Sequence, residues 1–183
     1  MAKQDFKHNF KVDAAIVDTV QFHQDPSALK QLTPPGSFLK LHTLEPLAEN
    51  SIADFTLYLG FLPIRWIARH KDVNFPQEFT DVQEEGPFKS WRHRHCFINH
   101  GDSTEVQDEI TLKFAPNFPQ NLVGRFICLT LPVLFAYRAW KTKVSIQAVL
   151  AMVVAHGYRN VFLPLLQPRM KRNEDASVGV SAV

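Results

Sequence analysis

The sequence has few cysteines and few glycines, and each scarcity removes a class of protein. Two cysteines, Cys96 and Cys128, among 183 residues are too few for a disulfide-stabilised scaffold. The seven glycines build no phosphate-binding loop, because Gly86 stands alone before Pro87. Neither a paired C-x-x-C nor a G-x-S-x-G motif occurs. With free thiols and the polar start "MAKQDFKHNF", the sequence predicts a cytoplasmic protein.

Long charged blocks and long apolar runs are also missing. The 20 basic and 18 acidic residues give a net charge of +2 without a single-sign block, which argues against a nucleic-acid partner. The basic cluster at 169–172 is interpreted as a solvated tail. The apolar runs 126–137 and 148–155 are each well short of the roughly 20 residues that cross a bilayer. They are interpreted as faces of buried helices, with a peripheral membrane contact by the C-terminal segment as the minor alternative.

The amino-acid composition favours one domain with a substantial core. The chain is 45% hydrophobic and contains 15 phenylalanines. Residues 5–12 alternate apolar and polar side chains, which predicts a half-buried strand. Residues 13–32 show helical spacing with a start signal at Asp25–Ser27, so two short helices are expected there. "TPPG" at 33–36 must end the second helix and turn the chain.

Residues 38–114 return repeatedly to strand alternation. About six strands are predicted, separated by breaks at Pro46, 60–63, Pro76, 84–87 and 100–103. Short loops favour antiparallel pairing of consecutive strands. In the last strand, 104–114, one face is core and the other faces water, and Asp108 is the single charge on the core side.

The remainder of the sequence has a helical rhythm. Residues 119–143 are expected to form one long helix that Pro132 kinks or restarts. One apolar stripe of this helix consists of Leu122, Phe126, Leu129, Val133 and Tyr137. A further helical segment is expected at 144–156, with Gly157 as its C-terminal stop. Residues 1–166 then form one domain, in which 144–166 is an extra helical segment, and 167–183 is predicted to be a disordered tail.

This order of elements is typical of a helix-grip fold, an α+β architecture. In this fold a curved antiparallel sheet of about seven strands wraps a long C-terminal helix and leaves a cavity between them. The stretches that carry a family resemblance are "FHQDPSALKQLTPPG", "PIRWIARH", "FTDVQEEGPFKSWRHRHCF", "TEVQDEITLKFAP" and "LFAYR". They resemble the START-like (SRPBCC) superfamily, and in particular its bacterial members labelled cyclase/dehydrase or ligand-binding SRPBCC proteins. The resemblance covers roughly residues 5–140 and implies a cavity for lipids, hormones, polyketides or aromatic compounds. It does not imply a reaction.

The stretch "GPFKSWRHRHCF" at 86–97 supplies the centre of the candidate site. In a strand, alternate residues share a face, so one face carries Trp91, His93, His95 and Phe97. In a helix-grip sheet this face points to the cavity, while Arg92 and Arg94 point to solvent.

Three further residues are expected on the same concave face. Asp108 needs a partner because an unpaired buried carboxylate is costly, and an inward histidine is the natural one. Asp81 is a second inward carboxylate, and Trp66 adds an aromatic wall. The predicted ligand-binding residues are therefore Trp66, Asp81, Trp91, His93, His95, Phe97 and Asp108.

Four roles compete for this cluster. A satisfied polar network that shapes the cavity needs only His–Asp hydrogen bonds, and ligand recognition can coexist with it. General acid/base catalysis would use a histidine whose tautomer Asp108 sets. Metal binding would use His93 and His95 with Asp108 as third ligand, but no further His or Cys is expected nearby, so neither a metal nor another cofactor is predicted.

The function favoured by the sequence is binding of a small apolar or aromatic molecule. One alternative is a cyclase, dehydrase or isomerase that uses the same pocket. The other is a non-enzymatic scaffold with a collapsed cavity, whose C-terminal segment docks a partner or a membrane.

Overall fold

The strands pair into one curved antiparallel sheet. The computed structural model describes residues 3–166, and over this range the chain forms seven strands and three helices. Their order is β1 (Gln4–Val12), α1 (Ile16–Gln24), α2 (Pro26–Gln31), β2 (Ser37–Leu44), β3 (Ile52–Leu59), β4 (Leu62–Asn74), β5 (Glu78–Glu85), β6 (Phe88–Asn99), β7 (Thr104–Phe114) and α3 (Gln120–Leu166). The strand order is β1-β7-β6-β5-β4-β3-β2, so consecutive strands from β2 to β7 are neighbours and β1 lies beside β7. The predicted helix-grip fold is confirmed.

Strand alternation sets which side chains face the interior. In β7 every second residue from Thr104 to Phe114 is buried, and Asp108 is among them with 5% exposure. In β6 the predicted inward face, Trp91, His93, His95 and Phe97, is buried as well. The period of two therefore predicted both faces correctly.

The two short helices form where the sequence signals them. Asp25 caps α2, because its Oδ1 accepts a hydrogen bond of 2.7 Å from the backbone N–H of Ser27. Pro26 occupies the first turn, where its missing N–H costs nothing. The turn before β2 ends at Gly36, whose φ of +86° suits glycine.

Helix α3 is longer and less interrupted than expected. It runs unbroken from Gln120 to Leu166, so a restart at Pro132 and a stop at Gly157 are both wrong. The exposed Pro132 removes only one backbone hydrogen bond, while its neighbour Leu131 and the following Phe135 are each 1% exposed. Their burial outweighs the lost bond. The predicted tail, 167–183, lies outside the described residues.

The buried face of α3 is not the predicted stripe. Leu122, Phe126, Leu129 and Val133 are 55–79% exposed. Between Gln120 and His156, the part of the helix whose burial is described, the buried residues are instead Gly124, Ile127, Leu131, Phe135, Ala139, Thr142 and Ile146. The lack of a Cβ at Gly124 favours packing of this face of α3 on the sheet, because a Cβ there would lie 3.2 Å from Phe88 Cε1. At Gly124 the helix therefore faces Phe88 and Phe114 without a side chain of its own.

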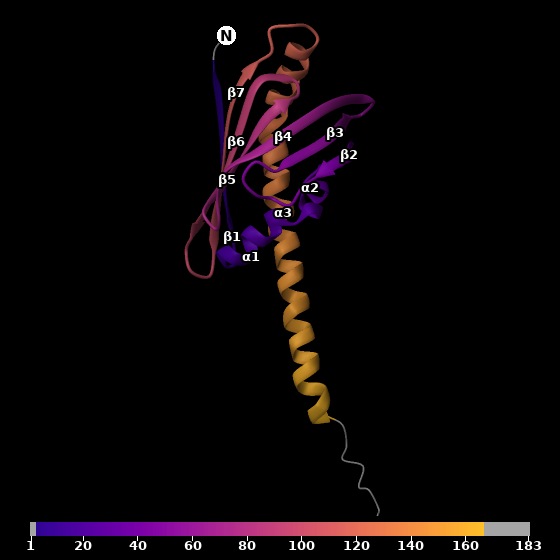
Figure 1. Cartoon of the computed structure of the whole chain (residues 1–183). Coiled ribbons are helices and arrows are strands. Elements are labelled where there is room, and N and C mark those ends of the chain that lie inside the picture. Colours follow the sequence, from indigo (N-terminus) through magenta and orange to yellow (C-terminus); the bar gives the residue numbers. More distant parts are fainter. Residues whose placement is uncertain (1–2, 167–183) are drawn as a thin grey trace, which may run out of the picture. The chain divides into compact units, whose positions relative to one another are not determined.

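The main core cluster joins this face of α3 to the sheet. Its buried members are Ile64, Phe88, Trp91, Ile110, Leu112, Phe114, Ile127, Leu131 and Phe135. Figure 1 shows the sheet beside the first part of α3, with α1 and α2 following β1 along the chain. The elements that the sequence separates most widely, β1 and α3, therefore contribute to one packed region.

The chain divides after Ala148 into two units. The sheet, α1, α2 and the first part of α3 belong to residues 1–148, and the predicted extra segment, 144–166, is a continuation of α3. The two apolar runs, 126–137 and 148–155, both lie on this one helix. From Gln120 to His156 it is long and apolar enough to cross a membrane by length and composition alone, a test that core helices of soluble proteins also pass.

Neighbouring leucines on α3 test the packing directly. Leu131→Ala should lower the free energy of unfolding by about 2–5 kcal/mol, because it leaves a cavity in the core. Leu129→Ala, at a residue that is 79% exposed, should change it by less than about 0.5 kcal/mol. Urea denaturation of both variants measures the difference, and equal losses would contradict this orientation of α3.

Candidate functional site

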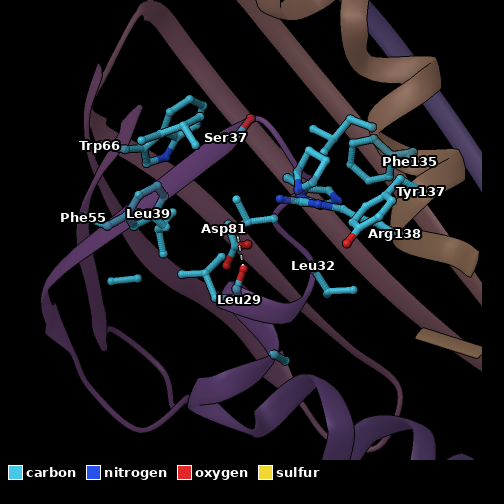
Figure 2. Close-up of a pocket in the computed structure, with 18 of the residues that line it drawn as sticks. Leu29, Leu32, Ser37, Leu39, Phe55, Trp66, Asp81, Phe135, Tyr137 and Arg138 are labelled. Atoms are coloured by element: carbon cyan, nitrogen blue, oxygen red, sulfur yellow. Dashed lines mark hydrogen bonds between the residues drawn. The ribbon is translucent and has the colours of Figure 1, made fainter. Parts of the chain in front are cut away.

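A cavity of about 860 Å³ lies between the sheet, the α1–α2 region and α3. Most of its wall is apolar, with Leu39, Phe55, Leu57, Trp66, Leu131 and Phe135 among the lining residues. Figure 2 shows Trp66 and Phe55 on one side of this pocket and Phe135, Tyr137 and Arg138 on the other, with Asp81 between them. Such a volume and lining are typical of small-molecule sites.

Two tryptophans form a rigid aromatic wall. Trp66 stacks on Phe55, with ring centroids 6.2 Å apart and planes 6° apart. Trp91 meets Trp66 edge to face at 5.4 Å and 90°. Both predicted tryptophans line the cavity. Flat surfaces at right angles suit a planar aromatic ligand.

Strand register brings the polar side chains together. Asp108 in β7 is directly opposite His95 in β6, and His93 is opposite Asp81 in β5. Asp81 in turn is opposite His70 in β4. Because all these residues project from the same face, they form a polar floor across the sheet.

The contacts within this polar floor are short. His93 Nε2 donates a hydrogen bond of 3.0 Å to Asp108 Oδ1. His95 Nδ1 lies 2.9 Å from the same oxygen, an ion-pair distance with an angle poor for a hydrogen bond. His95 Nε2 donates to Asp81 Oδ2 at 3.4 Å, and His70 Nε2 lies 3.3 Å from Asp81 Oδ1. Both buried carboxylates are thus paired with imidazoles.

These contacts drive the pKa values of the two central histidines apart. Burial alone would lower the pKa of His95, but its contacts with Asp108 and Asp81 outweigh burial and raise it to about 9. Burial and the neighbouring charge of His95 lower the pKa of His93 to about 4. The pKa of Asp108 is held well below its usual range, because the contacts with His93 and His95 outweigh its burial. Near neutral pH, His95 carries a proton and His93 is neutral.

The neutral state of His93 fixes its tautomer. Since Nε2 donates to Asp108, Nδ1 carries the lone pair and is an acceptor. His93 and His95 both line the cavity, and their ring centroids are 3.8 Å apart. A hydrogen-bond acceptor and a cationic donor therefore lie side by side at the floor.

Two of the predicted site residues do not line the cavity. Asp108 lies behind the histidines, and Phe97 packs against His23 at 5.0 Å between ring centroids. The other predicted site residues, Trp66, Asp81, Trp91, His93 and His95, all line it.

Three basic lining residues were missed, namely His23, His70 and Arg138. His70 follows Trp66 by four residues on β4, so the alternation that predicted Trp66 also points to His70. Arg138 directly follows the apolar run 126–137, and its position in the sequence does not indicate a cavity. No spacing in the sequence signals His23, which lies on α1. Burial lowers the pKa of its imidazole to about 4.

One group of side chains has the geometry of a metal site. Ligand atoms of Asp81, His93 and His95 lie within 4.8 Å of one another. The third member is Asp81 and not Asp108, which already contacts both histidines. A metal would have to displace the proton that Asp108 and Asp81 hold on His95. The absence of a metal stays a prediction, which elemental analysis of the purified protein checks.

Solved structures share this architecture at low sequence identity. The Zhui aromatase/cyclase from Streptomyces sp. R1128 superimposes with a TM-score of 0.66 at 9% identity, covering 80% of this chain and 94% of the other. Norcoclaurine synthase from Thalictrum flavum, in complex with dopamine and hydroxybenzaldehyde, gives 0.62 at 18% identity, covering 80% and 88%. The protein TTHA0849 from Thermus thermophilus gives 0.63 at 12% identity, covering 80% and 99%. No family model matches the sequence, and no curated protein matches it either.

These superpositions establish the fold. The chain has the START-like, or SRPBCC, helix-grip fold, as the resemblance of its motifs indicated. At these identities the likeness concerns the fold alone, so the function rests on the cavity itself.

The pairing of Asp108 can be tested by removing it. Asp108→Ala should leave His93 and His95 without their shared acceptor and cost on the order of 1–3 kcal/mol of unfolding free energy. Arg92→Ala removes an exposed ion pair with Asp72 on the outer face and should cost less than about 1 kcal/mol. Denaturation curves compare the two, and a larger loss for Arg92→Ala would refute the inward placement of Asp108.

The histidine pKa values predict how stability depends on pH. The raised pKa of His95 stabilises the fold fully below about pH 6.5, and this contribution is lost as the pH rises towards 9. The lowered pKa values of His93 and His23 reduce stability as the pH falls from about 6.5 towards 4. Unfolding free energy should therefore peak near pH 6.5, with a slope of about 1.4 kcal/mol per pH unit on the alkaline side, where one histidine titrates, and about twice that on the acid side, where two do.

The control for this profile is a histidine on the surface. His95→Gln should abolish most of the alkaline slope, whereas His100→Gln, at an exposed position, should retain it. An unchanged alkaline slope in His95→Gln would show that His95 is not the group responsible.

Proposed function

We propose that this protein binds a small apolar or aromatic molecule in the cavity between its sheet and α3. The observation that carries the proposal is an open volume of about 860 Å³ with apolar walls and a paired polar floor. Folding normally fills such a space with side chains, so an open cavity of this size favours a ligand as its occupant. The third candidate, a scaffold with a collapsed cavity, lacks this support.

Similar folds in other proteins agree with the proposal. Norcoclaurine synthase holds dopamine and hydroxybenzaldehyde, which are small aromatic compounds, and the Zhui protein is an aromatase/cyclase. The tryptophan wall of this chain offers comparable molecules a flat apolar surface. The proposed class of ligand is therefore aromatic or apolar, of a size that the cavity admits.

Catalysis on the bound molecule is the second candidate. It is favoured by the adjacent His93 and His95, whose pKa values lie near 4 and 9, because such a separation assigns an acceptor and a proton donor. Exchange of carbon-bound hydrogen for deuterium in an aromatic ketone, followed by NMR in D₂O, tests proton transfer. A rate no greater than that in buffer counts against an enzyme.

Binding itself can be tested with Nile red, a neutral apolar dye. Its addition should quench tryptophan emission saturably, because Trp66 and Trp91 line the cavity. Ala68→Phe places a ring inside the cavity wall and should weaken dye binding at least about tenfold by occupying ligand volume. EDTA should leave the affinity unchanged, since the imidazoles are assigned to hydrogen bonds.

The matched control is the same substitution on the solvent side of α3. Ala136→Phe adds an equal ring at an exposed position and should leave the affinity unchanged. Circular dichroism establishes that both variants fold. If Ala68→Phe folds and binds Nile red as the unmodified protein does, the dye does not occupy this cavity and the proposal fails.

A further inference from the structure

Arg138 is a half-buried cation that the polar floor does not pair directly. It lies on α3 beside Tyr137 and lines the cavity (Figure 2). Its Nε is buried and has no hydrogen-bond partner within the part of the chain that the structure describes. Asp108 and Asp81 act on it only through longer-range attraction, and its guanidinium lies 5.4 Å from the ring centroid of Phe135.

A guanidinium whose Nε is buried and unpaired among the described residues constrains what can fill the cavity. An arginine keeps its charge in a protein, and it offers five N–H donors and no acceptor. In the open cavity, water can hydrate these donors. An apolar ligand would displace that water and leave the donors without acceptors. The free-energy cost of such unsatisfied donors is larger than the net stabilisation that the same hydrogen bonds provide when they form. A ligand that fills this cavity therefore needs an acceptor atom facing Arg138.

The charges around the floor indicate which acceptor fits. Near neutral pH the negative groups are Asp81 and Asp108, whose pKa values are both lowered, and the positive groups are His95 and Arg138. These two pairs of charges balance. A carboxylate would bring an additional buried negative charge, whereas a carbonyl oxygen satisfies the donors and keeps the balance.

We propose that Arg138 donates hydrogen bonds to a neutral carbonyl oxygen of the ligand. The class of molecule that this protein binds is then an aromatic or apolar carbonyl compound, oriented with its oxygen at α3 and its apolar body against Trp66 and Trp91. This inference rests on the proposed binding function and adds the chemical group that the site selects.

Three probes of nearly equal shape test how much the carbonyl oxygen contributes to binding. They are 2-acetylnaphthalene, which carries a carbonyl group, 2-ethylnaphthalene, which carries none, and 2-naphthoate, which carries a carboxylate. The ketone should bind at least about tenfold more tightly than the hydrocarbon, the factor expected from hydrogen bonds to a charged donor. The carboxylate should bind no more tightly than the ketone. Equilibrium dialysis measures all three affinities.

Substitution of the arginine identifies the donor. Arg138→Met keeps an unbranched side chain and removes the donors, so it should abolish the preference for the ketone and leave hydrocarbon binding intact. Arg125→Met is the matched control, because Arg125 is an exposed arginine of α3 that does not line the cavity. It should retain the preference in full.

A spectroscopic measurement keeps the test independent of the variant's folding. Infrared spectra of ¹³C-carbonyl-labelled 2-acetylnaphthalene bound to the unmodified protein should show the carbonyl stretch at lower frequency than in hexane. Equal binding of ketone and hydrocarbon, an unshifted stretch, or a preference that survives Arg138→Met would overturn the proposal. Tighter binding of the carboxylate than of the ketone would also overturn it. If none of the three probes binds, the proposed function fails for aromatic molecules of this size, which is a separate outcome.

Discussion

A carboxylate buried in the middle of a sheet constrains this molecule more than any other feature. Asp108 is 5% exposed, and an isolated charge there would cost several kcal/mol. Its negative charge is tolerated because His93 and His95 approach the same oxygen from the neighbouring strand. That arrangement requires β6 and β7 to pair with His95 opposite Asp108, and it requires the second carboxylate, Asp81, to hold the other side of His95. The protonation states, the register of the central strands and the polarity of the cavity floor all follow from this one pairing.

The sheet and helix α3 contribute different features to the cavity. The sheet supplies the polar floor, which must stay hydrogen-bonded, and the tryptophan wall, which is rigid. Helix α3 covers them with Leu131 and Phe135, and Gly124 faces Phe88 and Phe114 without a side chain of its own. Arg138 belongs to the same helix, so the element that closes the cavity also presents this cation.

Most of the fold and part of the site can be predicted from the sequence, for a physical reason. A strand projects alternate residues to one face, so the inward row at Trp91, His93 and His95 and the anomalous Asp108 follow from spacing alone. The α3 face does not follow, because the helix is apolar on two sides and only contact with the sheet decides between them. Leu129 and Leu131 are indistinguishable by type, yet they are 79% and 1% exposed. Arg138 was missed for a related reason, since a charge inside an apolar run signals a cavity only when the empty space beside it is known.

The polar floor has a mechanical consequence for assembly of the sheet. From Ser51, whose Oγ contacts His70 Nδ1 at 2.9 Å, the contacts pass through Asp81 and His95 to Asp108 and so cross β4, β5, β6 and β7 at right angles to the chain direction. A strand paired one residue out of place would turn its member of this line to the opposite face and separate buried ions on both sides. This line of contacts therefore disfavours each slipped alignment, because a slip would separate its paired groups. The polar residues of the candidate ligand site therefore also favour one register of the strands that carry them.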